Sequence, residues 1–513
     1  MTMQMMGEVL CNVFSLQNLI FINVGMFIGI IFGAVPGMNG NLAITVFLPF
    51  TFQMDSVPAL LMLASIYFGS MFGGSISAIL INTPGTGAAT CTLLDGYPLC
   101  QKGQPHRALD TALVASTFGG LVSAFCLLLF APQLGKLALH FGSPEYFILA
   151  LFGLSVIASV SGDNPIKGIA AAALGVLIGT IGIDSVSGVP RFTFGNIMLY
   201  NGLKMMACML GLLAVLQMAE RVKNGALGKT GKSAAELKKA ASDDKFTMAD
   251  FKRCLGTMTM GSLLGALIGA IPGTGGGIAG YLTYNTAKNN AKPGEQFGKG
   301  EVKGIAAPES ANNGASAASL IPMLTLGIPG SAVAATLMGA FQMHGLSSGP
   351  KLFEDHPIAV YTILVGCVLS QLFMLLQGKY LMGLFVKITH VPYRLLTSCL
   401  LVIACAGAYA IANRSFDVKV MIVAGFVGYL IQFFDFPRIP MILGLILGPT
   451  AEFYLRNALT IGNGSWTIFI KRPICVVFIV LLVLLLAMLN KGNKKEKAQQ
   501  AEAAKQAKAA AKP

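Results

Sequence analysis

Charged residues are scarce in this sequence. Asp, Glu, Lys and Arg make up 11% of the 513 residues, whereas hydrophobic residues make up 54% and the mean hydropathy is +0.70. Soluble proteins carry roughly 25% charged residues, so the composition excludes an ordinary soluble protein. Apolar runs long enough to cross a bilayer, which takes about 20 residues, recur along the chain, for example at 17–35, 57–81, 110–131 and 361–386. The sequence therefore predicts an integral membrane protein.

Metal-binding and catalytic motifs are also missing. The ten cysteines are scattered singly without a CxxC pair, which argues against a zinc site or a disulfide framework. No HExxH pair, nucleophile elbow or paired intramembrane aspartates are present. Residues 228–233 resemble part of a Walker motif, but the glycine required five residues earlier is absent. The sequence therefore predicts that the chain is not an enzyme, does not hydrolyse ATP and holds no organic cofactor or metal.

The positive charge of the chain is concentrated outside the apolar runs. The formal net charge is +14, and residues 221–253 carry nine Lys or Arg against four acidic residues. The tail 490–513 carries seven lysines against two glutamates. Basic segments next to membrane spans mark the cytoplasmic side. We therefore predict a basic cytoplasmic linker at 222–254 and a basic disordered tail at 490–513, and no nucleic-acid partner.

Matching proline–glycine pairs indicate an internal duplication. Pro36-Gly37 recurs as Pro272-Gly273 at an offset of 236, and Pro84-Gly85 recurs as Pro329-Gly330 at an offset of 245. Each pair interrupts an apolar run. Proline removes an amide donor and glycine frees the backbone, so we expect a helix to break at each place.

The duplication predicts the fold. We expect a transmembrane repeat at 17–221, a second at 255–458 and a final transmembrane helix at 473–489. With the N-terminus outside and the linker inside, each repeat crosses the membrane an odd number of times, which makes the repeats inverted. The predicted fold class is an all-α integral membrane protein with about 10–12 transmembrane helices in two inverted repeats, broken or re-entrant segments and the extra C-terminal helix.

Broken helices in a membrane point to a binding site, because the freed backbone groups need partners. Neutral Asn, Ser and Thr donors and helix N-termini suit an anionic carboxylate. The predicted substrate-binding residues at the second pair of breaks are Asn82, Thr83, Gly85, Thr86, Asn312, Asn313, Gly330 and Ser331. The alternative is that these small residues only permit close helix packing, as we expect for Ser77.

The first pair of breaks is the candidate ion site. Carbonyls at the frayed ends of broken helices can coordinate sodium. The predicted ion-binding residues are Gly37, Asn39, Gly273 and Thr274. Glu309 is either a functional intramembrane carboxyl or part of a surface salt bridge. Lys167 and Lys419 either attract substrate or extend to a membrane interface.

Several motifs resemble one known family. They are Tyr67-Phe-Gly-Ser-Met-Phe-Gly-Gly-Ser75, Ile81-Asn-Thr-Pro-Gly85, Asp95-Gly-Tyr-Pro98, Phe141-Gly-Ser-Pro-Glu-Tyr146, Arg191-Phe-Thr-Phe-Gly195, Pro308-Glu-Ser-Ala-Asn-Asn313, Leu324-Thr-Leu-Gly-Ile-Pro-Gly-Ser331 and Lys471-Arg-Pro473. From about Gly25 to Pro473 the sequence resembles the large membrane subunit of the tripartite tricarboxylate transporters. Asn39 and Asn41 depart from the family, which is more glycine-rich in this segment.

The resemblance implies a function and partners. It implies the large permease subunit of a binding-protein-dependent secondary transporter in the bacterial inner membrane, with a small four-helix-type membrane subunit and a periplasmic solute-binding protein. The substrate would be a tricarboxylate or related organic acid, taken up with a Na⁺ (or H⁺) gradient. The alternatives are a passive organic-anion channel and a membrane-embedded enzyme. An internally duplicated chain with broken helices favours the transporter.

Overall fold

The computed structural model describes residues 3–160, 165–184, 187–216, 244–272, 275–388, 393–410 and 413–483. Helices account for nearly all regular structure in these ranges, which contain one two-stranded sheet. Five of the described helices are long and apolar enough to cross a bilayer: Leu16–Ala34, Ser56–Ile81, Pro105–Ala138, Pro357–Ile388 and Ser415–Phe433. The predicted all-α membrane fold is confirmed.

The chain divides into two compact units, and each is discontinuous in sequence. Unit 1 comprises Met1–His140 and Lys204–Tyr429, and unit 2 comprises Phe141–Leu203 and Leu430–Pro513. Each unit contains sequence from both predicted repeats, so a repeat is not a compact unit. The repeat boundaries and their inversion stay predictions. The linker 222–254 is described only from residue 244, the final helix as Pro473–Val483, and the tail 490–513 lies outside the described residues.

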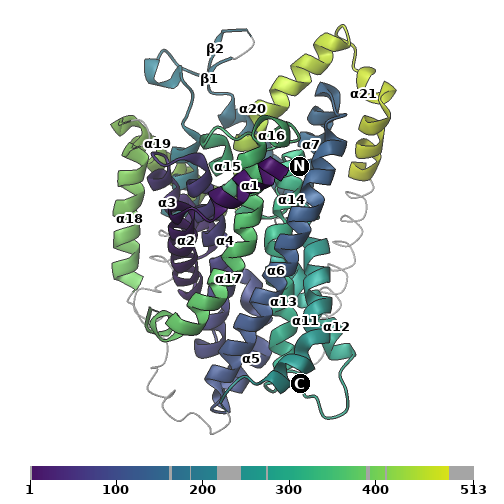
Figure 1. The fold of residues 1–513 in the computed structure, drawn as a ribbon. Helices are drawn as coiled ribbons and strands as arrows, with labels where there is room; N and C mark the ends of the chain where they lie inside the picture. The colour runs from purple at the N-terminus through teal and green to yellow at the C-terminus, as the bar shows by residue number, and fades with distance from the viewer. Residues whose placement is uncertain are drawn as a thin grey trace, which may run out of the picture. The chain divides into compact units, whose positions relative to one another are not determined.

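Unit 1 contains most of the helices labelled in Figure 1, and both pairs of breaks lie within its residue ranges. Its elements are α1 (Met3–Val13), α2 (Leu16–Ala34), α3 (Gly40–Thr51), α4 (Ser56–Ile81), the 3₁₀ helix η1 (Gly87–Thr90), α5 (Leu93–Gln101), α6 (Pro105–Ala138), α9 (Met205–Met209), the π-helix η3 (Leu210–Val215), α11 (Met248–Gly269), α12 (Gly275–Asn289), α13 (Val302–Ala318), α14 (Leu320–Leu326), α15 (Ala332–Met343), α16 (Leu352–Asp355), α17 (Pro357–Ile388), α18 (Tyr393–Ala410) and most of α19 (Ser415–Phe433).

The predicted breaks end helices in unit 1. Helix α4 ends before Asn82, whose φ is 54°, and α14 ends before Gly327, whose φ is 70°. Both values lie in the left-handed region, where an α-helix cannot continue. The Pro36 break separates α2 from α3, and the Pro272 break separates α11 from α12. The broken-helix prediction is therefore confirmed at all four places.

Glycine ridges bring two helix pairs of unit 1 into close contact. In each pair, three glycines spaced four residues apart face the partner helix, and a Cβ on any of them would overlap a backbone or serine oxygen. Small residues at this spacing let membrane helices approach closely. The glycines are Gly25, Gly29 and Gly33 of α2 against α4, and Gly261, Gly265 and Gly269 of α11 against α13. Because Gly25 to Gly261 is again an offset of 236, the two halves of the sequence pack in the same way.

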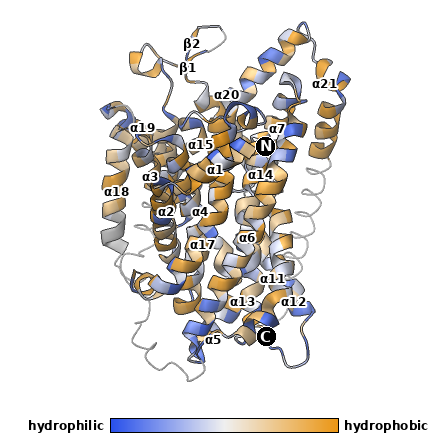
Figure 2. Ribbon diagram, viewed as in Figure 1, coloured by the Kyte–Doolittle hydropathy of each residue, from blue (hydrophilic) through white to orange (hydrophobic). Residues whose placement is uncertain are grey.

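In unit 1, the membrane-spanning helices are hydrophobic, whereas the residues at one end of these helices are hydrophilic (Figure 2). The ribbons of α2 and α4 are mostly orange, whereas blue segments gather on α5 and on the loop between α12 and α13. That loop carries Lys292, Glu295, Lys299 and Glu301. The polar residues therefore lie where the spans end, as a bilayer requires.

Unit 2 is built around α20 (Arg438–Ile461), against which α7 (Ser143–Val160) and α8 (Pro165–Gly179) pack. The remaining elements are β1 (Gly182–Ile183), β2 (Pro190–Arg191), the 3₁₀ helix η2 (Ile197–Leu199), α21 (Ile468–Lys471) and the helix Pro473–Val483. The strands pair antiparallel, with Gly182 opposite Arg191 and Ile183 opposite Pro190.

Ion pairs hold the polar end of unit 2 together. Arg191 lies 2.7 Å from Glu452, and Arg456 lies 2.8 Å from Asp184. Asp184, Arg191 and Glu452, together with the end of α8 and the middle of α20, line a cavity of about 190 Å³. Lys167 donates a hydrogen bond to the Phe434 carbonyl at 2.7 Å. Its ammonium group is thus held by a loop of unit 2.

Candidate functional site

The break at Pro84 leads to a contact between the two halves of the sequence, here called the first junction. It consists of η1, the start of α12 and the facing side of α13. A Cβ placed on Gly277 would lie 3.8 Å from the Gly87 carbonyl oxygen, and one on Gly280 would lie 3.7 Å from the Ala88 carbonyl oxygen. The 3₁₀ helix after the first-half break therefore rests on the helix that follows a second-half break.

The break at Pro329 leads to a corresponding contact, here called the second junction. It consists of α15, the start of α3 and the facing side of α4. Val333 Cγ1 lies 3.3 Å from the position of a Cβ on Gly40, and Thr336 Oγ1 donates to Asn41 Oδ1 at 3.2 Å. The two junctions are crossed, because each joins one half of the sequence to the other.

Gly85 and Gly330 fix the two breaks in the same way. The Gly85 amide donates to the Gly74 carbonyl, and the Gly330 amide donates to the Ser319 carbonyl, each at 3.1 Å. A Cβ on Gly85 would overlap the Gly33 carbonyl oxygen. A Cβ on Gly330 would come within 2.5 Å of the Gly269 carbonyl oxygen. Both amides are thus used by the protein, and both glycines are required by close packing.

Polar side chains in the second junction satisfy one another. The Tyr67 hydroxyl lies 3.2 Å from Ser319 Oγ and 3.1 Å from Ser331 Oγ. Ser331 is the N-cap residue of α15, where its Oγ accepts a hydrogen bond from the Ala334 amide at 3.1 Å. This network closes the junction, because the cap and the hydroxyls supply the partners that a helix N-terminus needs.

The first junction leaves buried polar atoms without a partner. Thr86 Oγ1, both polar atoms of the Asn312 amide and Asn313 Oδ1 have no hydrogen-bond partner among the described residues. Thr86 is 8% exposed, and the two asparagines are 0% exposed. Leaving such an atom unpaired costs about 1–3 kcal/mol. The absence of a side chain at Gly276 makes room for Asn312, since a Cβ there would overlap its Oδ1.

The difference between the junctions has a simple origin in the sequence. Asn312 stands 245 residues after Tyr67, the same offset that relates Pro84 to Pro329. By that offset Ser331 corresponds to Thr86. Tyrosine reaches across the second junction to Ser331, whereas the shorter asparagine does not hydrogen-bond to Thr86.

The remaining predicted site residues lie elsewhere around the breaks. Asn82 and Thr83 are exposed, and Thr83 Oγ1 donates to the Ile81 carbonyl at 3.2 Å. Gly37 has a φ of 76°, and the Asn39 side chain caps α3 by accepting from the Leu42 amide at 3.0 Å. Gly273 and Thr274 lie outside the described residues. Among the described residues, no hydrogen bond joins the 82–86 segment to the 327–331 segment.

Glu309 lies inside unit 1 and not at its surface. It is 0% exposed, and its two carboxyl oxygens accept hydrogen bonds from Thr92 Oγ1 and, at 2.8 Å, from Ser116 Oγ. The alternative prediction of a surface salt bridge is therefore wrong. The charged loop that precedes α13 suggested exposure, but the helix enters the packed core of unit 1 immediately after its first turn.

Two features of the junctions were not predicted from the sequence. Tyr67 and Ser319 belong to motifs identified above or lie near them, but no signal in the sequence assigned them to a common network. Thr92 and Ser116 were not singled out at all. The repeat offset of 245, applied to every residue around the breaks, would have paired Tyr67 with Asn312.

A family model confirms the resemblance. The model described as "Tripartite tricarboxylate transporter TctA family" matches residues 19–443. The chain belongs to this family. It is thus the large membrane subunit of a tripartite transport system and a multi-pass membrane protein.

Two relatives from Agrobacterium vitis extend the comparison. A protein named "Uncharacterized 52.8 kDa protein in TAR-I ttuC' 3'region" is 35% identical over 457 residues, which cover 89% of this chain and 90% of the relative. A second, named "Uncharacterized protein in TAR-II ttuC' 3'region", is 39% identical over 179 residues, or 35% of this chain and 74% of the relative. No solved structure matches the chain.

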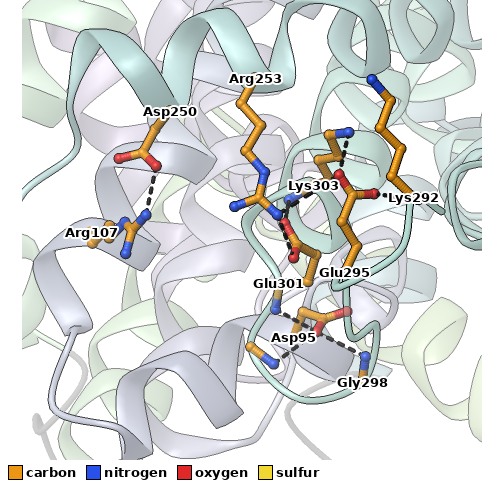
Figure 3. Close-up of polar contacts among 10 residues, drawn as sticks. Asp95, Arg107, Asp250, Arg253, Lys292, Glu295, Gly298, Glu301 and Lys303 are labelled. Carbon is orange, nitrogen blue, oxygen red and sulfur yellow. Dashed lines mark hydrogen bonds and ion pairs between the residues drawn. The ribbon is translucent and has the colours of Figure 1, made fainter.

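In this TctA-family chain, a carboxylate organises the loop that joins two elements of the first junction. Asp95 Oδ1 accepts the backbone amides of Gly298 at 2.9 Å, and of Gly300 and Glu301 at 2.8 Å each (Figure 3). Its Oδ2 accepts the Tyr284 hydroxyl at 2.8 Å. Asp95 on α5 thereby fixes the loop between α12 and α13.

Ion pairs surround this loop (Figure 3). Lys303 lies 2.7 Å from Glu295, and Arg253 lies 2.8 Å from Glu301. Burial raises the pKa of Glu295, but the hydrogen bonds from Lys303 and from the Lys292 amide, together with the nearby positive charges, outweigh it and lower that pKa below its ordinary value. The loop is therefore best held when its carboxylates are ionised.

Proposed function

We propose that this chain is the large transmembrane permease subunit of a binding-protein-dependent secondary transporter, which takes up a tricarboxylate or related organic acid with an ion gradient. The observation that carries this proposal is the set of unpaired polar atoms of Thr86, Asn312 and Asn313 in the first junction. Family membership supports the class of substrate. The unpaired atoms support a location for it.

The first junction suits a carboxylate chemically. The Asn312 amide group and the Thr86 hydroxyl supply neutral donors, which bind an anion without themselves carrying the large desolvation cost of a charge. The N-terminal end of α12 adds the positive end of a helix dipole. A bound carboxylate would therefore accept hydrogen bonds from the two unpaired donors, Asn312 Nδ2 and Thr86 Oγ1, whereas Asn312 Oδ1 and Asn313 Oδ1 would need a donor such as a hydroxyl of the acid.

The other predicted residues take supporting roles in this proposal. Asn82 and Thr83 are exposed beside the first break, where substrate would approach. Gly85 and Gly330 hold the breaks in place, and Ser331 closes the second junction. We propose Na⁺ (or H⁺) as the coupling ion, with Na⁺ bound near Gly37, Asn39, Gly273 and Thr274. Asn39 Oδ1 already accepts the Leu42 amide, and its second lone pair could coordinate an ion.

The proposed partners and location follow the family. We propose that the chain acts with a small four-helix-type membrane subunit and a periplasmic solute-binding protein in a bacterial inner membrane. The 221–253 linker and the tail beyond Asn490 would face the cytoplasm and the N-terminus the periplasm, because basic segments are retained on the cytoplasmic side. Labelling of introduced single cysteines from each side of the membrane tests this; a linker labelled from the periplasm would contradict it.

Uptake measurements test the proposed function. Vesicles containing the full complex and the cognate binding protein should accumulate one of a panel of labelled organic acids when a sodium or proton gradient is imposed. Depletion of ATP should not change the rate while the gradient is held. Counterflow, in which unlabelled substrate inside drives labelled substrate inward, should occur with a carrier and not with a channel. Uptake that requires ATP while the ion gradient is held would contradict the proposed function.

A further inference from the structure

We propose that Glu309 takes up one proton when an anionic substrate binds one helical turn away, so that proton uptake accompanies carboxylate binding. The identity of the ligand and its position at Asn312 and Asn313 rest on the proposed function. The argument for the proton rests on the contacts of Glu309 itself.

The hydrogen-bond partners of Glu309 fit both protonation states. Thr92 and Ser116 each contribute a hydroxyl, which can donate one hydrogen bond and accept others. The ionised carboxylate accepts from both. After protonation, the carboxylic acid donates to one of them, whose hydroxyl hydrogen turns away, and still accepts from the other. The network therefore survives the gain of a proton without moving a heavy atom.

Asp95 provides an internal contrast. Its Oδ1 accepts three backbone amides, which can only donate. That arrangement fits a carboxylate and offers no acceptor for a proton on Oδ1. Glu309 instead contacts hydroxyl groups, which can either donate or accept a hydrogen bond. The chain thus contains one carboxyl with donor-only contacts on Oδ1 and another with reversible contacts, and both are 0% exposed.

Glu309 is close to the unpaired atoms of the first junction. Asn312 and Asn313 follow it by three and four residues on α13, which places all three on neighbouring positions of one helix face. Asn313 Nδ2 donates to the Glu309 carbonyl at 3.2 Å. An ionised Glu309 would repel a carboxylate bound at these asparagines, and buried charges are poorly screened. Protonation removes the repulsion, and by linkage substrate binding favours the protonated form.

Apart from Cys91, the other titratable groups around α13 interact with partners other than Glu309. Cys91 interacts electrostatically with Glu309. Asp95 and Tyr284 bond to each other, Tyr67 bonds to Ser319 and Ser331, and Asp250 pairs with Arg107. Asp110 interacts with His106, Asp244 and Lys379, and Cys254 with Asp250, Arg253, Glu301 and Lys303. Among the described residues, Glu309 forms no ion pair. A proton is therefore the means available for neutralising it.

The burial of Glu309 couples the binding and release of its proton to conformational change. The Glu309 side chain is inaccessible to water in this conformation, so it cannot exchange a proton with solvent directly. Exchange requires the packing of α5 and α6 against α13 to open. A proton bound in one conformation is thus retained until the protein changes shape, which is what coupling to transport requires.

Infrared spectroscopy tests the titration without any ligand. The full-length protein in liposomes should show a protonated-carboxyl C=O band that changes with pH and is missing in Glu309→Gln. Glutamine keeps the size of the side chain and can both donate and accept, so this variant should fold. Glu354→Gln, which removes an exposed carboxyl of α16, is the matched control and should keep the band. If wild type and Glu309→Gln show the same pH difference spectra, the inference is overturned.

Citrate then tests the linkage. Binding of citrate should increase the protonated-carboxyl band in the wild type, and its apparent affinity should weaken about tenfold per pH unit above the range in which free Glu309 is protonated. In Glu309→Gln the affinity should not vary with pH in that range. Citrate that raises the melting temperature without changing the band would overturn the linkage. Citrate that does not bind, with the titrating band present, would contradict the proposed function for this acid and support Glu309 as a proton site.

Discussion

The two junctions have the same architecture and opposite hydrogen bonding. Each places the element after one break on a helix from the other half of the sequence, and each is fixed by a glycine amide bonded to a carbonyl at 3.1 Å. In the second junction Tyr67 joins Ser319 and Ser331. In the first, Asn312 and Thr86 at the corresponding positions stay unpaired. A duplicated scaffold can therefore use one copy for structure and leave the other available for a ligand.

Substituting the two glycines should have the largest effect and should affect both junctions equally. Gly85→Val and Gly330→Val place a branched side chain against the Gly33 and Gly269 carbonyls, respectively. We expect each variant to lose transport and most of its folded protein in the membrane. The cause is steric overlap with backbone, since both glycine amides are already bonded within the protein. Detergent-solubilised yield and uptake measure the effect, and Gly87→Ala, which meets no atom within 4 Å, is the control.

Asn312→Ala and Asn313→Ala should show that the first junction, and not the second, binds substrate. A lost hydrogen bond to a charged ligand is worth about 1.5–3 kcal/mol, so each variant should weaken the apparent affinity for substrate by on the order of tenfold or more. Stability should change little in Asn312→Ala, because neither polar atom of the Asn312 amide has a partner in the protein, whereas Asn313→Ala also removes the hydrogen bond from Asn313 Nδ2 to the Glu309 carbonyl. Subsaturating uptake and thermal unfolding measure the two effects.

Asn23→Ala is the matched control for these variants. The Asn23 amide is satisfied by the Leu19 carbonyl and by Gln377, at 2.9 and 3.1 Å. It should lower stability and leave affinity unchanged. Normal affinity in both Asn312→Ala and Asn313→Ala would place the substrate outside the first junction.

Tyr67→Phe should give the reverse pattern at the second junction. It removes a hydroxyl that bonds to Ser319 and Ser331, and a net hydrogen bond contributes about 0.5–1.5 kcal/mol to stability. We expect a lower melting temperature with an unchanged affinity for substrate. Ser77→Ala, a buried residue whose Oγ lies 3.4 Å from the Gly74 carbonyl, should do less. A large loss of affinity in Tyr67→Phe would mean that both junctions bind ligand.

Acidification should destabilise the loop of the first junction before it affects the second junction. This is the smallest of the predicted effects. The pKa of Glu295 is lowered in the folded protein, mainly because hydrogen bonds from Lys303 and the Lys292 amide outweigh the effect of burial. The contribution of Glu295 to the free energy of unfolding is complete above the ordinary pKa of glutamate. It is lost as the pH falls through the pKa of Glu295 in the folded protein. Hydrogen exchange in residues 291–301 should therefore accelerate on acidification, while exchange around Ser331 does not. Lys303→Met should remove most of the pH dependence.

Local patterns predicted the breaks because their cause is local. Proline lacks an amide hydrogen and glycine is flexible, so a Pro-Gly pair interrupts the helix at Pro36, Pro84, Pro272 and Pro329, whereas Pro49 and Pro308, which no glycine follows, lie inside helices. The exposure of Asn82 and the burial of Asn312 could not be obtained in the same way. Asn82 follows one apolar stretch and Asn312 precedes another. Only packing against other helices makes Asn82 exposed and Asn312 buried.

The sequence by itself determined that this is a helical membrane protein of the TctA family, that its helices break at matching places, and that the polar residues Asn312 and Asn313 precede the break at Pro329. Only the tertiary structure decided that η1 rests on α12 and α15 on α3, that Tyr67 closes one junction, and that Thr92 and Ser116 bury Glu309. The reason is physical. Hydropathy and helix termination depend on neighbouring residues, whereas the partner of a buried polar atom is chosen by contacts between segments about 200 residues apart, such as Thr92 and Glu309.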